Sequence, residues 1–183
     1  MTLPLPLTVR VCRADYANPV HAAAVVSLLD AYAQDPMGGG EALSPFAKAH
    51  LVSALAARPQ AFSVLAFSSV DAVADGLASP APRPIGLVNC LEGFSTFACQ
   101  PLVNIHDLTV LPGYRGQRVA EKMLQLVEDI ARERGACKLT LEVLEGNAGA
   151  IKLYDRIGFA NYQLDPAMGS AQFLQKSLKN SSD

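Results

Sequence analysis

The sequence predicts a single α/β domain spanning residues 1–183, with a mixed sheet of about seven strands. Half of the 183 residues (50%) are hydrophobic and only 17% are charged, a composition that supports one packed core and argues against disorder. Two strand-like segments, 102–110 and 137–143, flank a helix-like segment at 117–134. Because a crossover helix connects them, these two strands must run parallel.

The first half of the chain predicts alternating strands and helices. Asn18-Pro19 and Ser44-Pro45 each place a capping residue before a proline, which is typical of helix starts. The glycine-rich segment Asp35–Glu41 predicts a loop between the two helices. The expected elements are a strand at 7–14, a helix from 18 to about 34, a helix from 44 to about 57, and a strand at 62–67.

The second half predicts more strands than helices. A segment rich in Ser, Ala and Pro, 68–84, is expected to form a loop. The stripe of apolar residues at 117–134 predicts an amphipathic helix, which Gly135 ends. The expected elements are strands at 85–96, 102–110 and 137–143, helices at 117–134 and 148–157, and a closing strand pair at 162–164 and 172–178.

Charge and composition limit the classes of partner. Fifteen basic and seventeen acidic residues give a net charge of −2, which predicts no nucleic-acid or anionic membrane surface. No apolar run reaches bilayer length, and the N-terminal segment lacks a basic start and contains prolines. The four cysteines lack metal-site or disulfide spacing. We therefore expect a cytoplasmic protein without metal that binds small molecules.

Two linked segments carry the chemistry: Val110–Ala120 and Asn147–Phe159. In the first, a strand runs into a Pro-Gly turn and then a helix start, so that backbone N–H groups converge at the positive end of a helix dipole. Such a site binds anions, and the glycine spacing excludes the two common nucleotide-binding loops.

Both segments resemble motifs of the GCN5-related N-acetyltransferase (GNAT) superfamily. Its pyrophosphate loop reads Arg/Gln-x-x-Gly-x-Gly/Ala, and here Arg115-Gly-Gln-Arg-Val-Ala120 departs from it at Arg118, which replaces the middle glycine. The later motif, Asn-x-x-Ala-x-x-x-Tyr-x-x-x-Gly-Phe, matches at every defining position of Asn147–Phe159. The resemblance implies a GNAT-like fold with a splayed parallel strand pair, and acetyl-CoA as cofactor.

The resemblance also implies which residues hold acetyl-CoA. Backbone groups of Leu108 and Val110 would pair with the strand-like pantetheine arm. Asn147 would contact the pantetheine as well as capping its helix. The pyrophosphate would be held by Arg115, Gly116, Gln117, Arg118, Val119 and Ala120.

Two residues are candidate catalysts. Tyr154, about two helical turns after Asn147, is by resemblance the general acid for the departing thiolate; the alternative is a packed structural tyrosine. His106 is at a position where GNAT enzymes commonly place a base, and a histidine can take a proton near neutral pH; the alternative is a structural histidine. Strand alternation puts Asn104, His106 and Leu108 on one face and Ile105 and Asp107 on the other.

Acidic and aromatic residues predict the acceptor side. The candidates are Glu41, Glu92, Phe94 and Asp107, a set that favours a cationic amine. The segments Phe94–Phe97 and Ile105–Leu108 resemble the diamine acetyltransferase branch of the superfamily.

The expected function is therefore transfer of an acetyl group from acetyl-CoA to a primary amine, with a small cationic amine as acceptor, by direct attack. Two alternatives stay open: a non-catalytic acyl-CoA-binding sensor or interaction module, and transfer of a bulkier acyl group or transfer to a protein N-terminus. Homodimers are common in the superfamily, and the sequence leaves the oligomeric state undecided.

Overall fold

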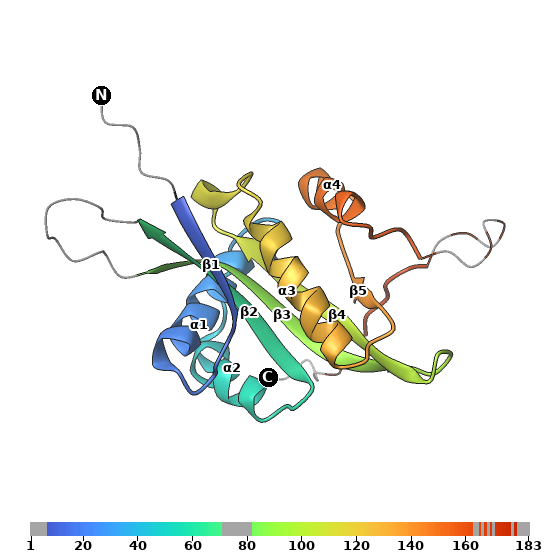
Figure 1. Ribbon diagram of the computed structural model, residues 1–183, viewed down its shortest axis with the longest axis horizontal. Helices are drawn as coiled ribbons and strands as arrows, with labels where there is room; N and C mark the ends of the chain where they lie inside the picture. Colours follow the sequence, from blue (N-terminus) through green and yellow to red (C-terminus); the bar gives the residue numbers. More distant parts are fainter. Residues whose placement is uncertain are drawn as a thin grey trace, which may run out of the picture. The chain divides into compact units, whose positions relative to one another are not determined.

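The computed structural model describes residues 7–70 and 82–162, together with residues 165, 167, 169, 171–176 and 178 of the C-terminal tail. Most of segment 68–84, expected as a loop, lies outside the described residues. The chain divides into two compact units, Met1–Leu141 and Glu142–Asp183. The predicted α/β class is confirmed, because the first unit combines one mixed sheet with three α-helices among its described residues (Figure 1).

The elements follow the predicted order with small shifts at their ends. The first unit contains β1 (Leu7–Arg13), α1 (Pro19–Ala33), α2 (Pro45–Ala56), β2 (Ala61–Val70), β3 (Arg83–Ser95), β4 (Gln100–Val110), the short 3₁₀ helix η1 (Pro112–Tyr114), α3 (Val119–Glu133) and β5 (Leu139–Leu141). The second unit contains α4 (Ala148–Arg156).

One sheet with the order β1-β2-β3-β4-β5 forms the centre of the first unit. The first four strands are antiparallel neighbours, and β5 runs parallel to β4, as the crossover through α3 requires. The predicted parallel pair is thus confirmed.

The sheet has five strands among the described residues instead of about seven. The expected closing pair is absent there, because residues 162, 172–176 and 178 are described and lie outside any strand; residues 163, 164 and 177 are outside the described part. Phe173 and Leu174 are 73% and 83% exposed. A strand in this segment would be stabilised by burying one apolar face against the protein, and these exposed side chains bury none.

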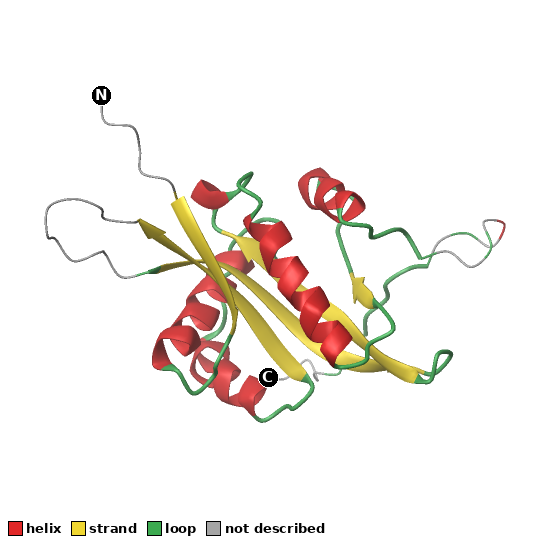
Figure 2. Ribbon diagram, viewed as in Figure 1, coloured by secondary structure: helices red, strands yellow, loops and turns green. Residues whose placement is uncertain are grey.

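Helices cover both faces of the sheet in the first unit (Figure 2). Ala24, Val25 and Leu28 of α1 form a buried cluster with Leu65 and Phe67 of β2 and Leu87 of β3. The methionine Met123 of α3 packs on the opposite face, where the absence of a side chain at Gly86 leaves room for it: a Cβ there would lie 2.8 Å from Met123 Cε. The sheet is therefore the middle of three layers.

The predicted helix starts at Asn18 and Ser44 are confirmed. Asn18 Oδ1 accepts hydrogen bonds from the N–H groups of Val20 and His21, and Ser44 Oγ accepts one from the N–H of Ala47. An ion pair of 2.8 Å between Lys48 and Asp30 then joins α2 to α1. These contacts fix the two helices that lie beside the α1–α2 loop.

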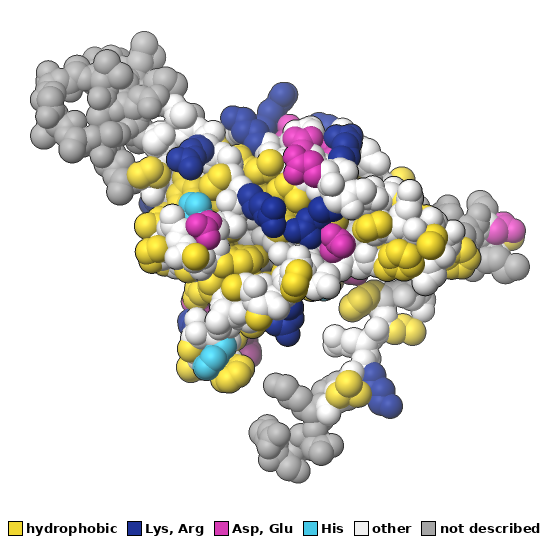
Figure 3. Space-filling view, turned by 60° about the horizontal axis from the view of Figure 1, so that its bottom comes forward, with side chains coloured by type: hydrophobic (Ala, Val, Ile, Leu, Met, Phe, Trp, Pro, Cys, Tyr) yellow, Lys and Arg dark blue, Asp and Glu magenta, His cyan; other side chains and the backbone are white. Residues whose placement is uncertain are grey.

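One face of the molecule shows how the charged side chains are distributed. On the face that Figure 3 shows, Lys and Arg side chains are scattered among acidic and hydrophobic ones. None of the helices described in the structure is both long enough and apolar enough to span a bilayer.

Candidate active site

The parallel pair separates at the carboxyl end of β4. Strand β5 pairs only with residues 103–105 of β4. In the described part of the chain, the edge of β4 from His106 to Val110 therefore has no strand partner on the side of β5. Free backbone groups along such an edge can pair with an extended, amide-rich ligand. Leu108 and Val110, predicted to bind the cofactor, lie on this edge.

His106 lies at an irregularity in β4. Asn89 pairs with Asp107, but the next residue of β3, Cys90, pairs with Ile105, so His106 has no partner on β3, as in a β-bulge. Because Asn89 and Cys90 are adjacent on a strand, their partners Asp107 and Ile105 lie on opposite faces. The predicted strict alternation, with Ile105 and Asp107 on one face, is wrong at this point.

His106 itself is exposed and reaches its neighbour two residues earlier. Its Nε2 lies 3.5 Å from Asn104 Nδ2. Asn104 Oδ1 in turn accepts a hydrogen bond of 3.1 Å from Thr140 Oγ1 of β5. The imidazole therefore lies at the point where β4 and β5 begin to separate.

The loop between β4 and α3 has two residues with left-handed backbone conformations. Gly116 has φ +77° and Arg118 has φ +59° and ψ +22°. Nothing lies within 4 Å of a Cβ placed on Gly116, so this backbone is open to a ligand. The arginine occupies a conformation that glycine adopts without strain, which explains why the motif has glycine at this position.

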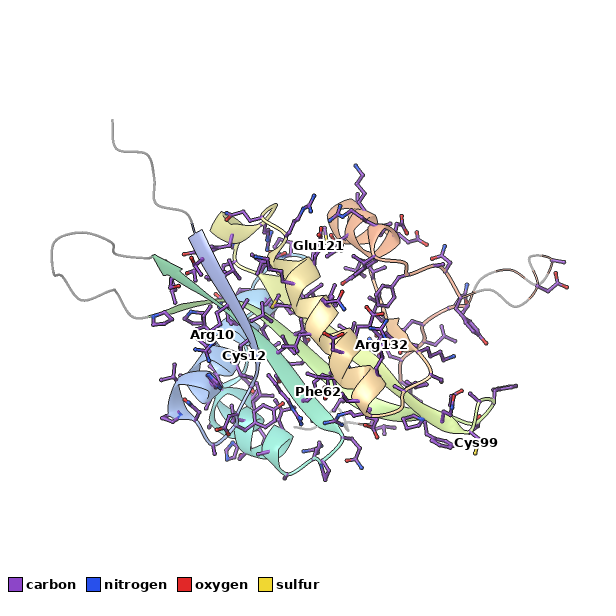
Figure 4. The ribbon with its side chains drawn as sticks, viewed as in Figure 1. Arg10, Cys12, Phe62, Cys99, Glu121 and Arg132 are labelled. Carbon is purple, nitrogen blue, oxygen red and sulfur yellow. The ribbon has the colours of Figure 1, made fainter. Side chains whose placement is uncertain are left out.

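Helix α3 begins at Val119 without a side-chain cap. The first intrahelical hydrogen bond of α3 runs from Lys122 N–H to Arg118 O at 3.2 Å. The N–H groups of Val119 and Ala120, which come before Lys122, therefore have no acceptor within the helix. The guanidinium of Arg118 is 81% exposed and lies 3.9 Å from Glu121, whose side chain Figure 4 shows at the start of the helix. The helix start thus combines backbone donors with a flexible positive charge, which suits an anion.

Arg115 binds the protein's own groups. Its Nε donates to Val110 O and its Nη2 to Asp35 Oδ2, each at 2.9 Å. The carbonyl of Val110, at the end of β4, is therefore already bonded to this guanidinium. Asp35 also accepts a hydrogen bond of 2.9 Å from Met37 N–H. These two interactions, the Met37 bond foremost, lower the pKa of Asp35.

The α1–α2 loop is held by backbone contacts. Gly38 N–H and Gly40 N–H both donate to Asp35 O, and Glu41 N–H donates to Ala33 O. A Cβ at Gly38 would lie 1.9 Å from the carbonyl oxygen of Tyr32, so only glycine fits there. Glu41, one of the predicted acceptor residues, lies exposed at the end of this loop.

The structure separates the other predicted acceptor residues. Asp107 accepts a hydrogen bond of 3.0 Å from Asn89 Nδ2. Glu92 forms an ion pair of 2.9 Å with Arg134, which lies at the end of α3. Because Glu92 and Asn89 are three positions apart on β3, their side chains lie on opposite faces of the sheet. Phe94 is 58% exposed near the tip of the β3–β4 hairpin. Of these three, Asp107 lies nearest to the free end of β4.

Asn147 and Tyr154 belong to the second unit. Asn147 Oδ1 accepts a hydrogen bond of 3.1 Å from Ala150 N–H, so the predicted capping role is confirmed. Tyr154, on the last turns of α4, is 9% exposed and packs edge-on against Phe159 with ring centroids 5.7 Å apart. The tyrosine is therefore held firmly within the C-terminal motif.

Comparison with known proteins identifies the family. The family model for the Acetyltransferase (GNAT) family matches residues 51–159, more than half of the chain. The chain belongs to the GNAT family. The match includes both motifs, together with strand β4 and helices α3 and α4.

Several acetyltransferases are similar to parts of this GNAT protein. Streptothricin acetyltransferase of Streptomyces lavendulae is 40% identical over 87 residues, which cover 46% of each chain. N-alpha-acetyltransferase 30 of Schizosaccharomyces pombe is 38% identical over 56 residues, or 31% of this chain and 37% of that protein. Thialysine N-epsilon-acetyltransferase of Bos taurus is 36% identical over 56 residues, 31% of this chain and 33% of that one. The chain thus spans less than half the length of these relatives.

Solved structures share the GNAT fold over most of the chain. A probable acetyltransferase superposes with a TM-score of 0.68 and 22% identity, covering 95% of this chain and 99% of the other. An aminoglycoside acetyltransferase from an uncultured soil metagenomic sample has a TM-score of 0.69 and 14% identity, covering 93% and 97%. At these identities the likeness establishes the fold alone.

Three side-chain pairings around the site are not predicted from the sequence. Asn89 holds Asp107, Arg134 binds Glu92, and Asp35 binds Arg115. The last pair joins residues 80 positions apart. A local motif search cannot find such partners, although Asp35 was within the predicted glycine loop.

Proposed function

We propose that this GNAT protein transfers an acetyl group from acetyl-CoA to a primary amine of a small cationic molecule. The free edge of β4 from His106 to Val110, followed directly by the open loop at Gly116 and the start of α3, is the observation that carries this proposal. It supplies an extended edge for an amide-rich arm and a donor-rich helix start for a pyrophosphate, in the order that one molecule of acetyl-CoA needs.

The residues present fit acetyl-CoA. Leu108 would offer backbone groups to the pantetheine, and Asn147 of the second unit has this role by its motif. The pyrophosphate would lie on the loop from Gly116 to Ala120, where Gln117 is tied to Gly113 O by a hydrogen bond of 3.3 Å. When bound, acetyl-CoA supplies the activated acetyl thioester.

Arg115 would support the pyrophosphate loop and would not bind the phosphates directly. Its Nε and Nη2 are bonded to Val110 and Asp35, so it supports the loop and adds positive charge near it. Arg118 has the exposed guanidinium, and we assign the direct charge-assisted bond to the phosphates to it.

Two side chains would move protons. His106 would take a proton from the acceptor amine, so that the uncharged nitrogen can accept the acetyl group that bound acetyl-CoA would supply. Tyr154 gives its hydroxyl proton to the departing sulfur, as its place in the motif implies. The proton balance is completed when His106 and Tyr154 return to their resting forms through solvent.

Relatives and the acidic acceptor side support a cationic amine. Proteins similar to this chain are named for acetylating streptothricin and thialysine, and a structure with the same fold is an aminoglycoside acetyltransferase. Asp107, on the face of the sheet that carries α1, offers the carboxylate that would attract such a substrate, with Glu41 on the adjoining loop.

The test is a panel of diamines, aminoglycosides, streptothricin, amino acids and peptides, with release of the coenzyme A thiol measured and acetylated products identified by mass spectrometry. The highest kcat/KM is expected for amines that carry a second ammonium group. A clear preference for peptide N-termini would contradict the small-cation proposal and favour protein acetylation. Binding of acetyl-CoA without transfer to any amine would favour a non-catalytic acyl-CoA-binding module.

A further inference from the structure

A row of hydrogen bonds crosses the sheet and ends at Asp107. The Tyr16 hydroxyl lies 2.8 Å from Ser63 Oγ, Ser63 Oγ donates to Asn89 Oδ1 at 2.6 Å, and Asn89 Nδ2 donates to Asp107 Oδ2 at 3.0 Å. Ser63 and Asn89 are register partners on β2 and β3, and Asn89 and Asp107 are partners on β3 and β4. The row therefore joins the loop after β1 to the three following strands on one face of the sheet.

The row has only one consistent direction while Asp107 is ionised. A carboxylate can only accept, so the Asn89 amide must turn its N–H₂ group toward Asp107 and its oxygen toward Ser63. Ser63 then uses its single proton for Asn89, and Tyr16 must donate to Ser63. Burial raises the pKa of Tyr16 and so keeps this phenol a donor. All the donors point toward Asp107, an arrangement in which each bond strengthens the next.

The middle of the row is shielded from water. Ser63 is fully buried and Asn89 is 6% exposed. Within the described residues, every buried side-chain nitrogen or oxygen has a hydrogen-bond partner. Removing one donor would therefore leave a buried acceptor that water cannot readily satisfy, and the Asn89 amide would lose what fixes its orientation.

Asp107 faces the helix that leads into the α1–α2 loop. Burial raises the pKa of Tyr32, near the end of α1, and the negative charges of Asp107 and Asp35 raise it further. The Asp107 carboxylate therefore lies within electrostatic reach of the last turn of α1. Asp107 is partly exposed, and Asn89 donates to its Oδ2.

We infer that Asn89, Ser63 and Tyr16 are positioning residues that orient the Asp107 carboxylate to bind the non-reacting ammonium group of the acceptor. This inference rests on the proposed transfer to a cationic amine and adds its specificity determinant. The row of hydrogen bonds fixes the orientation of the Asp107 carboxylate. It does not relay a proton, because the Asn89 amide in its middle cannot pass a proton on as a hydroxyl does. Its disruption should therefore weaken recognition of the cationic group and leave the chemical step intact.

The kinetic test compares the best cationic acceptor from the amine panel with an analogue in which a hydroxyl replaces only the non-reacting ammonium. Ser63→Ala should raise KM for the cationic acceptor about fivefold, the scale of one hydrogen bond, with kcat and the KM of the analogue nearly unchanged. Tyr16→Phe should have a smaller effect in the same direction, because it acts one bond farther from Asp107. Ser68→Ala is the matched control, since Ser68 is a buried serine of the same strand outside the row.

A second readout is independent of activity. In the folded protein, the NMR signals of the Asn89 side-chain amide should shift in Ser63→Ala and in Tyr16→Phe but not in Ser68→Ala. Unshifted Asn89 signals in both row variants would overturn the positioning role. So would a KM change of equal size for the cationic acceptor and its analogue, which would place the effect at the reacting amine or in the fold. If wild type acetylates no amine, the proposed function fails on its own, and the NMR comparison still decides whether the row positions Asp107.

Discussion

Arg115 and Asp35 form an ion pair of 2.9 Å that joins the loop before α3 to the loop between α1 and α2. The arginine is the first residue of the pyrophosphate motif, and the aspartate begins the glycine loop of the acceptor side. Because the same guanidinium also bonds Val110 O, it connects three segments of the site. The loop before α3 and the α1–α2 loop, proposed to bind cofactor and acceptor, are thus held together by one side chain.

Asp35→Asn should lower the free energy of unfolding by about 0.2–1 kcal/mol at neutral pH, the usual range for an exposed pair. The folded-state pKa of Asp35 lies below its ordinary value of 3.8, mainly because of the Met37 N–H bond and then because of Arg115. These two contacts therefore stabilise the protein above that pH and stop doing so as the pH falls through the lowered pKa. Urea unfolding at several pH values should therefore show a difference between wild type and variant at pH 7 that disappears as the pH falls through the lowered pKa of Asp35. The control is Glu133→Gln, at the end of α3; an equal effect from it would mean that the Arg115 pair contributes nothing specific.

Arg118→Gly and Arg118→Ala should have different effects on stability. Arg118 has a left-handed backbone, which glycine adopts freely and alanine does not. The glycine variant should be more stable than the alanine variant by about 1 kcal/mol, in thermal or urea unfolding. Equal stability of the two variants would contradict the left-handed conformation.

The same two variants distinguish the contribution of the Arg118 side chain to acetyl-CoA binding from that of the loop backbone. Both lack the guanidinium, so both should bind acetyl-CoA more weakly than wild type and with a weaker dependence on salt. If affinity is unchanged in both, Arg118 does not contact the phosphates, and the backbone of the loop holds them alone.

The cysteines should differ strongly in reactivity. Burial raises the pKa of Cys90 to about 12, whereas Cys99 and Cys137 are exposed, Cys99 at the tip of the β3–β4 hairpin (Figure 4). Because the thiolate is the nucleophile, iodoacetamide at pH 8 should modify the two exposed cysteines first and reach Cys90 only in denaturant. Mass spectrometry of peptides checks this, and labelling of Cys90 in the folded protein at the rate of Cys99 would contradict the packing of β3.

Tyr154→Phe should lower kcat by about 100-fold with little change in acetyl-CoA affinity, because the hydroxyl acts only as charge develops on sulfur. The ring packed on Phe159 is retained in this variant, so the fold should be preserved. Tyr162→Phe, at an exposed tyrosine of the same unit, serves as the control. An unchanged kcat in Tyr154→Phe, with chemistry limiting turnover, would leave Tyr154 a structural residue.

Local sequence signals predicted the helix starts well. Asn18, Ser44 and Asn147 each accept the backbone N–H bonds expected of a cap, because capping depends on residues only two or three positions away. The parallel pairing of β4 and β5 also followed from the sequence, since a crossover helix permits no other direction.

Features that depend on pairing between distant segments could not be predicted. The irregularity at His106 follows from the register between β3 and β4, and no local pattern in β4 signals it. Glu92 is predicted as an acceptor residue because it is acidic and lies close to aromatic residues in the sequence. Its ion pair with Arg134, 42 positions later, has no local signal. The two partners of Asn89, Ser63 and Asp107, likewise come from other strands.

Calorimetric titration with acetyl-CoA tests the central claim most directly, because the proposed chemistry depends on this molecule. Wild type should release or take up heat with a one-to-one stoichiometry, and its stability should rise by about 2.7 kcal/mol when free acetyl-CoA is 100 times its Kd. A bulky residue in place of Gly116, whose φ is +77°, should weaken this binding. Absence of both heat and thermal stabilisation in wild type at millimolar acetyl-CoA would contradict the account.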